Sequence, residues 1–259
     1  VGAILSANDL GPLTVLMEGG GALASSGSVV VDGVTHSSNV TASGSGIAGT
    51  NTAGYYLVDN AIRGFVVQGA DGRMASITVD SVQSAATDSG LYWGRWTGTN
   101  LRVNATGLGT AATSAAVLAL PDTLNIHYIL GNTVPTIPST GLVGFSFVGG
   151  TPSTDASGSL GAGITSGTLT ADYFYQQMSG NFSVSHGSSS YSVSASGLPI
   201  TAAKFSGTGI AVGSGTYSTS ISGFLSGTGA PTGVGLAYTI QSPSAIAGVG
   251  AFKATTLPP

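Results

Sequence analysis

Cysteine and charge are what this 259-residue chain has least of. It has no cysteine, which excludes a disulfide framework, a zinc–thiolate site and cysteine catalysis. Only 6% of its residues are Asp, Glu, Lys or Arg, against roughly 25% in an average globular domain. The basic residues are scattered singly along the chain, at Arg63, Arg73, Arg95, Arg102, Lys204 and Lys253. No basic patch is available to neutralise phosphates, so the sequence predicts no nucleic-acid partner.

Long apolar runs are also missing. Stretches such as residues 115–120 fall far below the ~20 residues that a membrane-spanning helix needs, so no transmembrane helix is expected. Helical periodicity is almost absent as well. Hydrophobic residues nevertheless make up 42% of the chain, which is enough to bury a core.

What the chain has instead is alternation and turns. Segments 145–147, 182–185 and 191–195 alternate apolar with hydroxyl residues, as half-buried antiparallel strands do. Asp32-Gly33 and Asp71-Gly72 each separate two such segments with hairpin-turn chemistry. The sequence therefore predicts an all-β fold: an antiparallel β-barrel of about eight strands in residues 90–259, with an additional N-terminal layer of β-hairpins in residues 1–89. Prolines at 121, 135 and 138 leave the boundary open between residues 85 and 140, and a layer continuous with the barrel stays an alternative.

The region after residue 90 resembles a known family. The segments that carry the resemblance are LYWGRW at 91–96, LNIHYILG at 124–131, GFSFVGGTPSTD at 144–155, SGTLTAD at 166–172, GFLSGTGA at 223–230, VGLAY at 234–238 and IAGVGAF at 246–252. In this order they resemble the C-terminal β-barrel region of bacterial FecR-domain-containing surface proteins. They are more distantly similar to the barrels of transferrin-binding surface lipoproteins, whose Gly-x-Phe-x-Gly-x-x-Ala element is followed here with altered spacing by Gly223, Phe224 and Ala230. The resemblance implies a bacterial, cell-surface or extracellular barrel, and it transfers no binding site.

Catalytic and metal-binding patterns are not found in the sequence. It contains no Gly-x-Ser-x-Gly, and its three histidines, His36, His127 and His186, lie far apart. No cluster of His, Asp and Glu has the spacing of metal ligands. We therefore expect a non-enzymatic protein with no cofactor and no metal.

The aromatic residues suggest one candidate contact. Trp93 and Trp96 are the only tryptophans, and strand alternation places them on opposite faces, so one is expected in the core. By the same alternation, Tyr173 and Tyr175 should share one face of a strand and Phe174 the other.

Two functional interpretations follow. The first is a structural subunit of a homopolymeric surface assembly (a filament, sheath or surface layer), because the chain has little charge to keep copies apart. Its joining strand would lie in residues 1–16, with apolar Ile4, Leu10, Leu13, Val15 and Leu16. The alternative is a surface-anchored barrel that binds a host protein, glycan or small ligand. Exposed aromatic residues gathered on one rim would favour this alternative. An outer-membrane pore is a third interpretation, disfavoured by the 7% aromatic content.

Overall fold

The computed structural model contains nineteen β-strands and no helix among the residues it describes. It describes residues 134, 136–155 and 157–255, and, before them, the strands between residues 2 and 131. In that earlier part, burial is described only for residues 88, 90–95, 125, 127–129 and 131. No described helix is long and apolar enough to cross a membrane.

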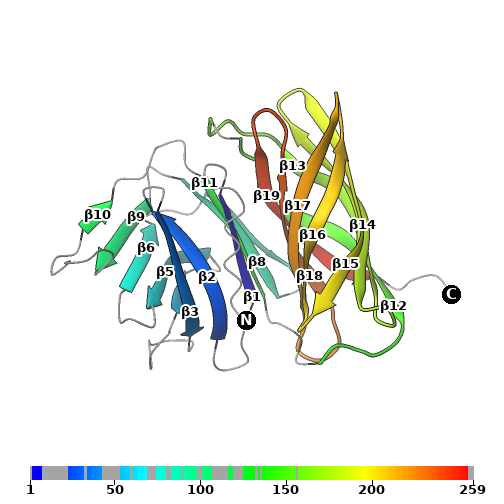
Figure 1. The fold of residues 1–259 in the computed structure, drawn as a ribbon, viewed down its shortest axis with the longest axis horizontal. Helices are drawn as coiled ribbons and strands as arrows, with labels where there is room; N and C mark the ends of the chain where they lie inside the picture. The colour runs from blue at the N-terminus through cyan, green and yellow to red at the C-terminus, as the bar shows by residue number, and fades with distance from the viewer. Residues whose placement is uncertain are drawn as a thin grey trace.

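The C-terminal part is a closed antiparallel barrel, as the sequence predicts (Figure 1). Its eight strands follow one another in chain order, and β12 pairs with β19 to close it. They are β12 (Leu142–Gly150), β13 (Gly163–Asp172), β14 (Gln177–His186), β15 (Ser189–Thr201), β16 (Lys204–Val212), β17 (Thr216–Ser226), β18 (Gly233–Ile240) and β19 (Ile246–Thr255).

The N-terminal part is made of hairpins and two sheets, again as predicted. One sheet has the order β1-β11-β8-β7, formed by β1 (Gly2–Ala7), β7 (Gln83–Asp88), β8 (Leu91–Thr97) and β11 (Asn125–Gly131). A second has the order β10-β9-β6-β5-β4, formed by β4 (Ala53–Val58), β5 (Ala61–Gln68), β6 (Met74–Val79), β9 (Leu101–Thr106) and β10 (Ala116–Leu118). The strands β2 (Leu23–Val31) and β3 (Val34–Ala42) pair with each other up to Val31 and Val34, the residues on either side of the predicted turn. The barrel's first strand begins at Leu142, so β8 and β11 belong to a flanking sheet although the sequence grouped them with the barrel.

Alternation in the sequence explains one side of the barrel wall. Along β14 and β15, apolar residues such as Phe182 and Val193 are buried, whereas the serines between them face outward and are exposed or half-buried. This is the pattern of strands with one face on the core and one in water. The barrel interior is therefore filled by a single apolar cluster that includes Phe145, Leu169 and Phe252.

The opposite side of the wall is buried on both faces. Every residue of β18 is buried, and so are the first seven of β19. The reason is that the sheet containing β8 and β11 packs on the outside of the barrel there. Seven buried residues form this contact: Leu91, Trp93, Ile129, Phe224, Ala237, Val249 and Ala251. Both faces being covered, these strands are near-continuous runs of apolar residues and glycine rather than alternating ones.

Glycines in the strands make room for aromatic rings. In four places a glycine lies directly opposite a large ring on the neighbouring strand, and a Cβ added to the glycine would collide with that ring. The pairs are Gly94 with Tyr128, Gly223 with Phe205, Gly235 with Phe224 and Gly248 with Tyr238. Ring-over-glycine packing explains why a chain with 42 glycines still builds a dense wall.

Candidate functional site

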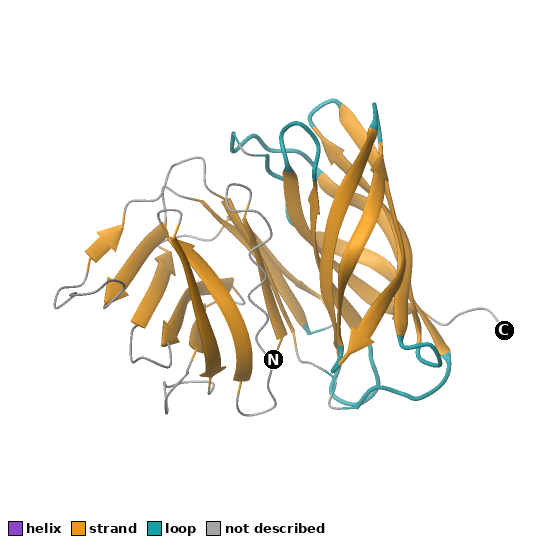
Figure 2. Cartoon of the chain, viewed as in Figure 1, coloured by secondary structure: helices purple, strands orange, loops and turns teal. Residues whose placement is uncertain are grey.

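Two large aromatic side chains stand exposed at one end of the barrel, in the turn between β13 and β14. Phe174 is 68% exposed and Tyr175 is 67% exposed. Their rings touch edge to face, with centroids 4.9 Å apart. We call this end the aromatic rim; it is formed by residues 136–141, 173–176, 202–203 and 227–232. Figure 2 shows the barrel's connections gathered at its two ends.

Hydrogen bonds hold this turn in one conformation. The Asp172 carboxylate accepts from the backbone amides of Phe174 and Tyr175, at 3.0 and 3.1 Å. Gln176, in a left-handed conformation with φ of 51°, donates from its side-chain amide to the carbonyls of Pro138 and Tyr173. A turn fixed in this way presents its rings with little conformational entropy left to lose on binding.

The turn is anchored by a buried ring. Tyr173 is 1% exposed and packs in the barrel core, and its burial raises the pKa of its hydroxyl to about 12. Its backbone amide donates to the carbonyl of Gly141 at 2.9 Å. The neighbouring Leu142, opposite Asp172 in the β12–β13 ladder, is 57% exposed and extends the apolar surface.

Strand alternation predicted this segment incorrectly. It placed the two tyrosines on one face and Phe174 on the other, but β13 ends at Asp172, so the next four residues form a turn. The turn buries Tyr173 and exposes both Phe174 and Tyr175. The available signal was Asp172 itself, since an Asp that bonds amides two and three residues later is typical of turns.

The other end of the barrel carries a buried polar cluster. His127 of β11 is fully buried, and its Nδ1 and Nε2 form hydrogen bonds of 2.7 Å with the hydroxyls of Thr151 and Thr154 from the β12–β13 loop. Arg95, its cross-strand partner, is also buried and donates to the side chain of Asn125. Burial, with a smaller contribution from the charge of Arg95, lowers the pKa of His127 to about 3. The cluster fastens the flanking sheet to the barrel through a neutral imidazole.

A serine, a histidine and an aspartate also meet at this end. The Ser153 hydroxyl lies 3.0 Å from Nδ1 of His186, whose Nε2 lies 3.3 Å from the Asp155 carboxylate. Ser153 is 0% exposed, and its hydroxyl donates to the carbonyl of Ser185 at 3.1 Å. A nucleophile needs access to its substrate, and this hydroxyl is enclosed. The arrangement ties the β12–β13 loop to the β14–β15 turn. Among the described residues no group of His, Asp and Glu has the geometry of a metal site.

The residues predicted as contacts lie elsewhere in the fold. Trp93 is 5% exposed, packs over Gly149 and belongs to the contact between sheet and barrel, as the core interpretation of one tryptophan predicted. The backbone of Trp96 lies in β8, and its side chain is outside the described residues. Ile4 lies in β1, paired with Ile129 of the same chain, whereas residues 8–22, with Leu10, Leu13, Val15 and Leu16, are outside the described residues. The joining role of these residues stays a prediction.

Comparison with known proteins gives solved structures only. No protein-family model and no curated protein sequence matches the chain. Among solved structures it is similar to a single and a double mutant of the vaccine antigen transferrin-binding protein B from Haemophilus parasuis Hp5, at 12% identity and TM-scores of 0.43 and 0.42. The matches cover 98% and 99% of this chain but 45% of the solved chain in each case, so the chain spans less than half of their length. No family model supports the FecR-type resemblance. A similarity of this size does not indicate what the chain binds.

Proposed function

We propose that the chain is a non-catalytic binding module, displayed on a bacterial surface, that holds a protein partner against the aromatic rim. The observation that carries the proposal is the exposed, edge-to-face pair of Phe174 and Tyr175 on a turn held by hydrogen bonds. Rigid aromatic side chains are the residues that most often dominate protein–protein binding energy. Gathered aromatics on one rim are also the feature that separates a binding barrel from a structural subunit.

A protein partner suits the shape and chemistry of this rim better than a charged ligand. The rings and Leu142 project outward instead of lining a pocket, so they can enter a hollow on a folded partner. From residue 173 to residue 177 no side chain is charged, and the carboxylate of Asp172 is engaged with the turn amides. Binding should therefore depend on apolar burial and respond weakly to salt.

The homopolymer interpretation keeps residues 1–16 as its predicted joining segment. Within that segment, all six residues of β1 pair with β11 of the same chain, and β1 forms one edge of its sheet. The low charge of the barrel has another explanation, because a closed barrel has no strand edge to protect. We propose the absence of catalysis because the one Ser–His–Asp arrangement among the described residues has a buried serine.

The test uses purified extracellular proteins as probes. A panel of secreted and plasma glycoproteins is printed as an array and probed with the intact chain. Each positive signal is then repeated as a surface plasmon resonance titration. We expect saturable binding to at least one protein, weakened about 30-fold in a Phe174→Ser/Tyr175→Ser variant, since a hot-spot residue contributes about 2 kcal/mol or more. The matched control is Val212→Ser, which removes another exposed apolar side chain (52% exposed) at the other end of the barrel and should bind like wild type.

Two results would reject the proposal. The first is saturable binding that the rim variant retains in full. The second is no saturable binding to any protein of the panel, together with polymers that elute at high mass in size-exclusion chromatography with light scattering and are ordered in negative-stain images. This result would restore the structural-subunit interpretation.

A further inference from the structure

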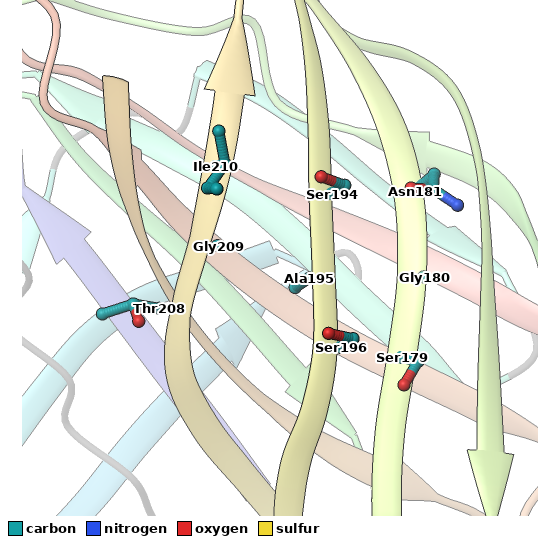
Figure 3. A pocket seen from close by; sticks show the side chains of 9 residues that line it. All are labelled: Ser179, Gly180, Asn181, Ser194, Ala195, Ser196, Thr208, Gly209 and Ile210. Carbon is teal, nitrogen blue, oxygen red and sulfur yellow. The ribbon is translucent and has the colours of Figure 1, made fainter. Parts of the chain in front are cut away.

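A groove of about 490 Å³ lies on the outer wall of the barrel, on the face made by β14, β15 and β16. Figure 3 shows its side chains in two rows across the three strands. Asn181, Ser194 and Ile210 form one row, consistent with their direct pairing in the two ladders. Ser179, Ser196 and Thr208 form the other. From this groove we infer a second binding site, for a neutral carbohydrate chain.

The floor between the two rows is made of the smallest residues. Gly180, Ala195 and Gly209 lie there. A Cβ on Gly180 would lie 2.6 Å from the Leu169 side chain, and one on Gly209 would lie 2.6 Å from the Ser194 carbonyl oxygen. Both of these Cβ positions, like the Ala195 side chain, point towards the barrel core, so the floor of the groove is backbone. Outward rows two residues apart leave a trough about 7 Å wide at the ordinary rise of a strand.

An irregularity in the wall opens the groove. Between the pairs Ser194–Ile210 and Ile200–Phe205, β15 has five residues (195–199) where β16 has four (206–209), so the regular ladder is interrupted. Gly197 sits in this bulge with φ of 66°, and its amide donates to the Ser179 hydroxyl at 3.1 Å. Bulges of this kind re-aim side chains and often lie at binding sites.

The chemistry of the lining selects the ligand class. None of the nine lining residues is charged, so the groove offers no partner to a phosphate, a carboxylate or a metal ion. It offers hydroxyls and one amide, which both donate and accept hydrogen bonds, as the hydroxyls of a sugar do. The side chains of Asn181, Ser194 and Thr208 have no hydrogen-bond partner within the described part of the chain.

Size and one apolar side chain complete the match. The volume falls within the 300–1,000 Å³ that is typical of small-molecule sites. Ile210 is 52% exposed beside the polar groups and can pack against the C–H face of a sugar ring. A fully apolar ligand would leave the hydroxyls and the amide without partners, at a cost in free energy.

The experiment titrates the ¹⁵N-labelled chain with three neutral hexasaccharides (maltohexaose, cellohexaose and chitohexaose) and with a heparin hexasaccharide as the charged comparison. We expect one of the neutral sugars to give saturable shifts of Gly180, Gly209 and the Asn181 side-chain amide, with a Kd on the order of 1 mM. Ile210→Ser and Asn181→Ala should each weaken binding at least about fivefold. Val212→Ser is the matched control, because Val212 lies two residues from Ile210 on the same face and is equally exposed at 52%.

Three outcomes would overturn the inference: no saturable shift with any neutral sugar up to roughly 20 mM, equal affinity in Ile210→Ser and wild type, or preference for the heparin fragment. The rim variant Phe174→Ser/Tyr175→Ser should bind the sugar as wild type does. The sugar site and the proposed protein-binding rim can therefore fail independently.

Discussion

The buried His127 should make the stability of the protein fall between pH 7 and pH 5. In the folded chain burial, aided by Arg95, lowers the pKa of His127 to about 3, whereas in the unfolded chain it returns to about 6.5. Between these values only the unfolded chain binds the proton, so stability is fully present above about pH 6.5 and is lost as the pH falls. From pH 7 to pH 5 the loss is about 2 kcal/mol. Within this window the figure hardly depends on the folded pKa, provided that it stays below about 4.

Urea unfolding at the two pH values, followed by tryptophan fluorescence, measures this loss. His127→Asn and His127→Gln remove the titration and are each designed to keep one contact, the first with Thr151 and the second with Thr154. Both variants should be less stable than wild type at pH 7. Neither should show the fall of about 2 kcal/mol in unfolding free energy between pH 7 and pH 5. The lowered pKa of Asp155 keeps that carboxylate ionised throughout the window, so it adds nothing to the difference. Equal losses in wild type and both variants would refute the argument.

Two further outcomes test the packing of the wall. Gly223→Ala places a methyl within 2.6 Å of three ring carbons of the buried Phe205, whose ring must shift by about 1.5 Å to reach normal contact. The free energy of unfolding should drop by about 1–3 kcal/mol. Gly229→Ala, where nothing lies within 4 Å, is the control and should change stability by less than about 0.5 kcal/mol in the same urea titration. Lys253 lies 4.0 Å from Asp88 with both side chains well exposed, so Lys253→Met should leave the urea midpoint within experimental error; a large loss would contradict the weakness expected of such pairs.

Most of the fold could be predicted because antiparallel strands and their turns have patterns that are visible within a few neighbouring residues of the sequence. The alternation in residues 182–185 and 191–195 and the pairing of the two strands on either side of Asp32-Gly33 depend only on neighbouring residues, and each is confirmed. The flanking sheet could not be assigned in the same way. Leu91 and Ile129 pack on the outer face of β17–β19. A contact between segments so far apart in the sequence produces no repeating pattern of apolar residues that would identify the partner. The continuous apolar runs of β18 and β19 were the signal that both faces are covered.

The candidate sites were harder to predict than the fold. Phe174 and Tyr175 become a site only because the strand ends at Asp172, before the three aromatic residues that alternation placed in it, and such boundaries are the least reliable part of a prediction. The groove depends on a bulge at Gly197, and serine, glycine and threonine occur throughout this chain. The uncharged lining of the groove is what a chain with 6% charged residues supplies.

Low charge first suggested a packed assembly, but in the barrel, residues 142–255, it has a simpler cause in the closure of the sheet. Charged residues on strands serve largely to keep edges from pairing with other chains, and a closed barrel has no edge to protect. In this barrel β12 pairs with β19, and the apolar outer face of β18 and β19 is covered by the chain's own sheet. What remains exposed on β14–β16 is mainly hydroxyl and small residues. On such a surface the few large exposed side chains, Phe174 and Tyr175 above all, are exceptions that packing does not require, and this is why we assign them to binding.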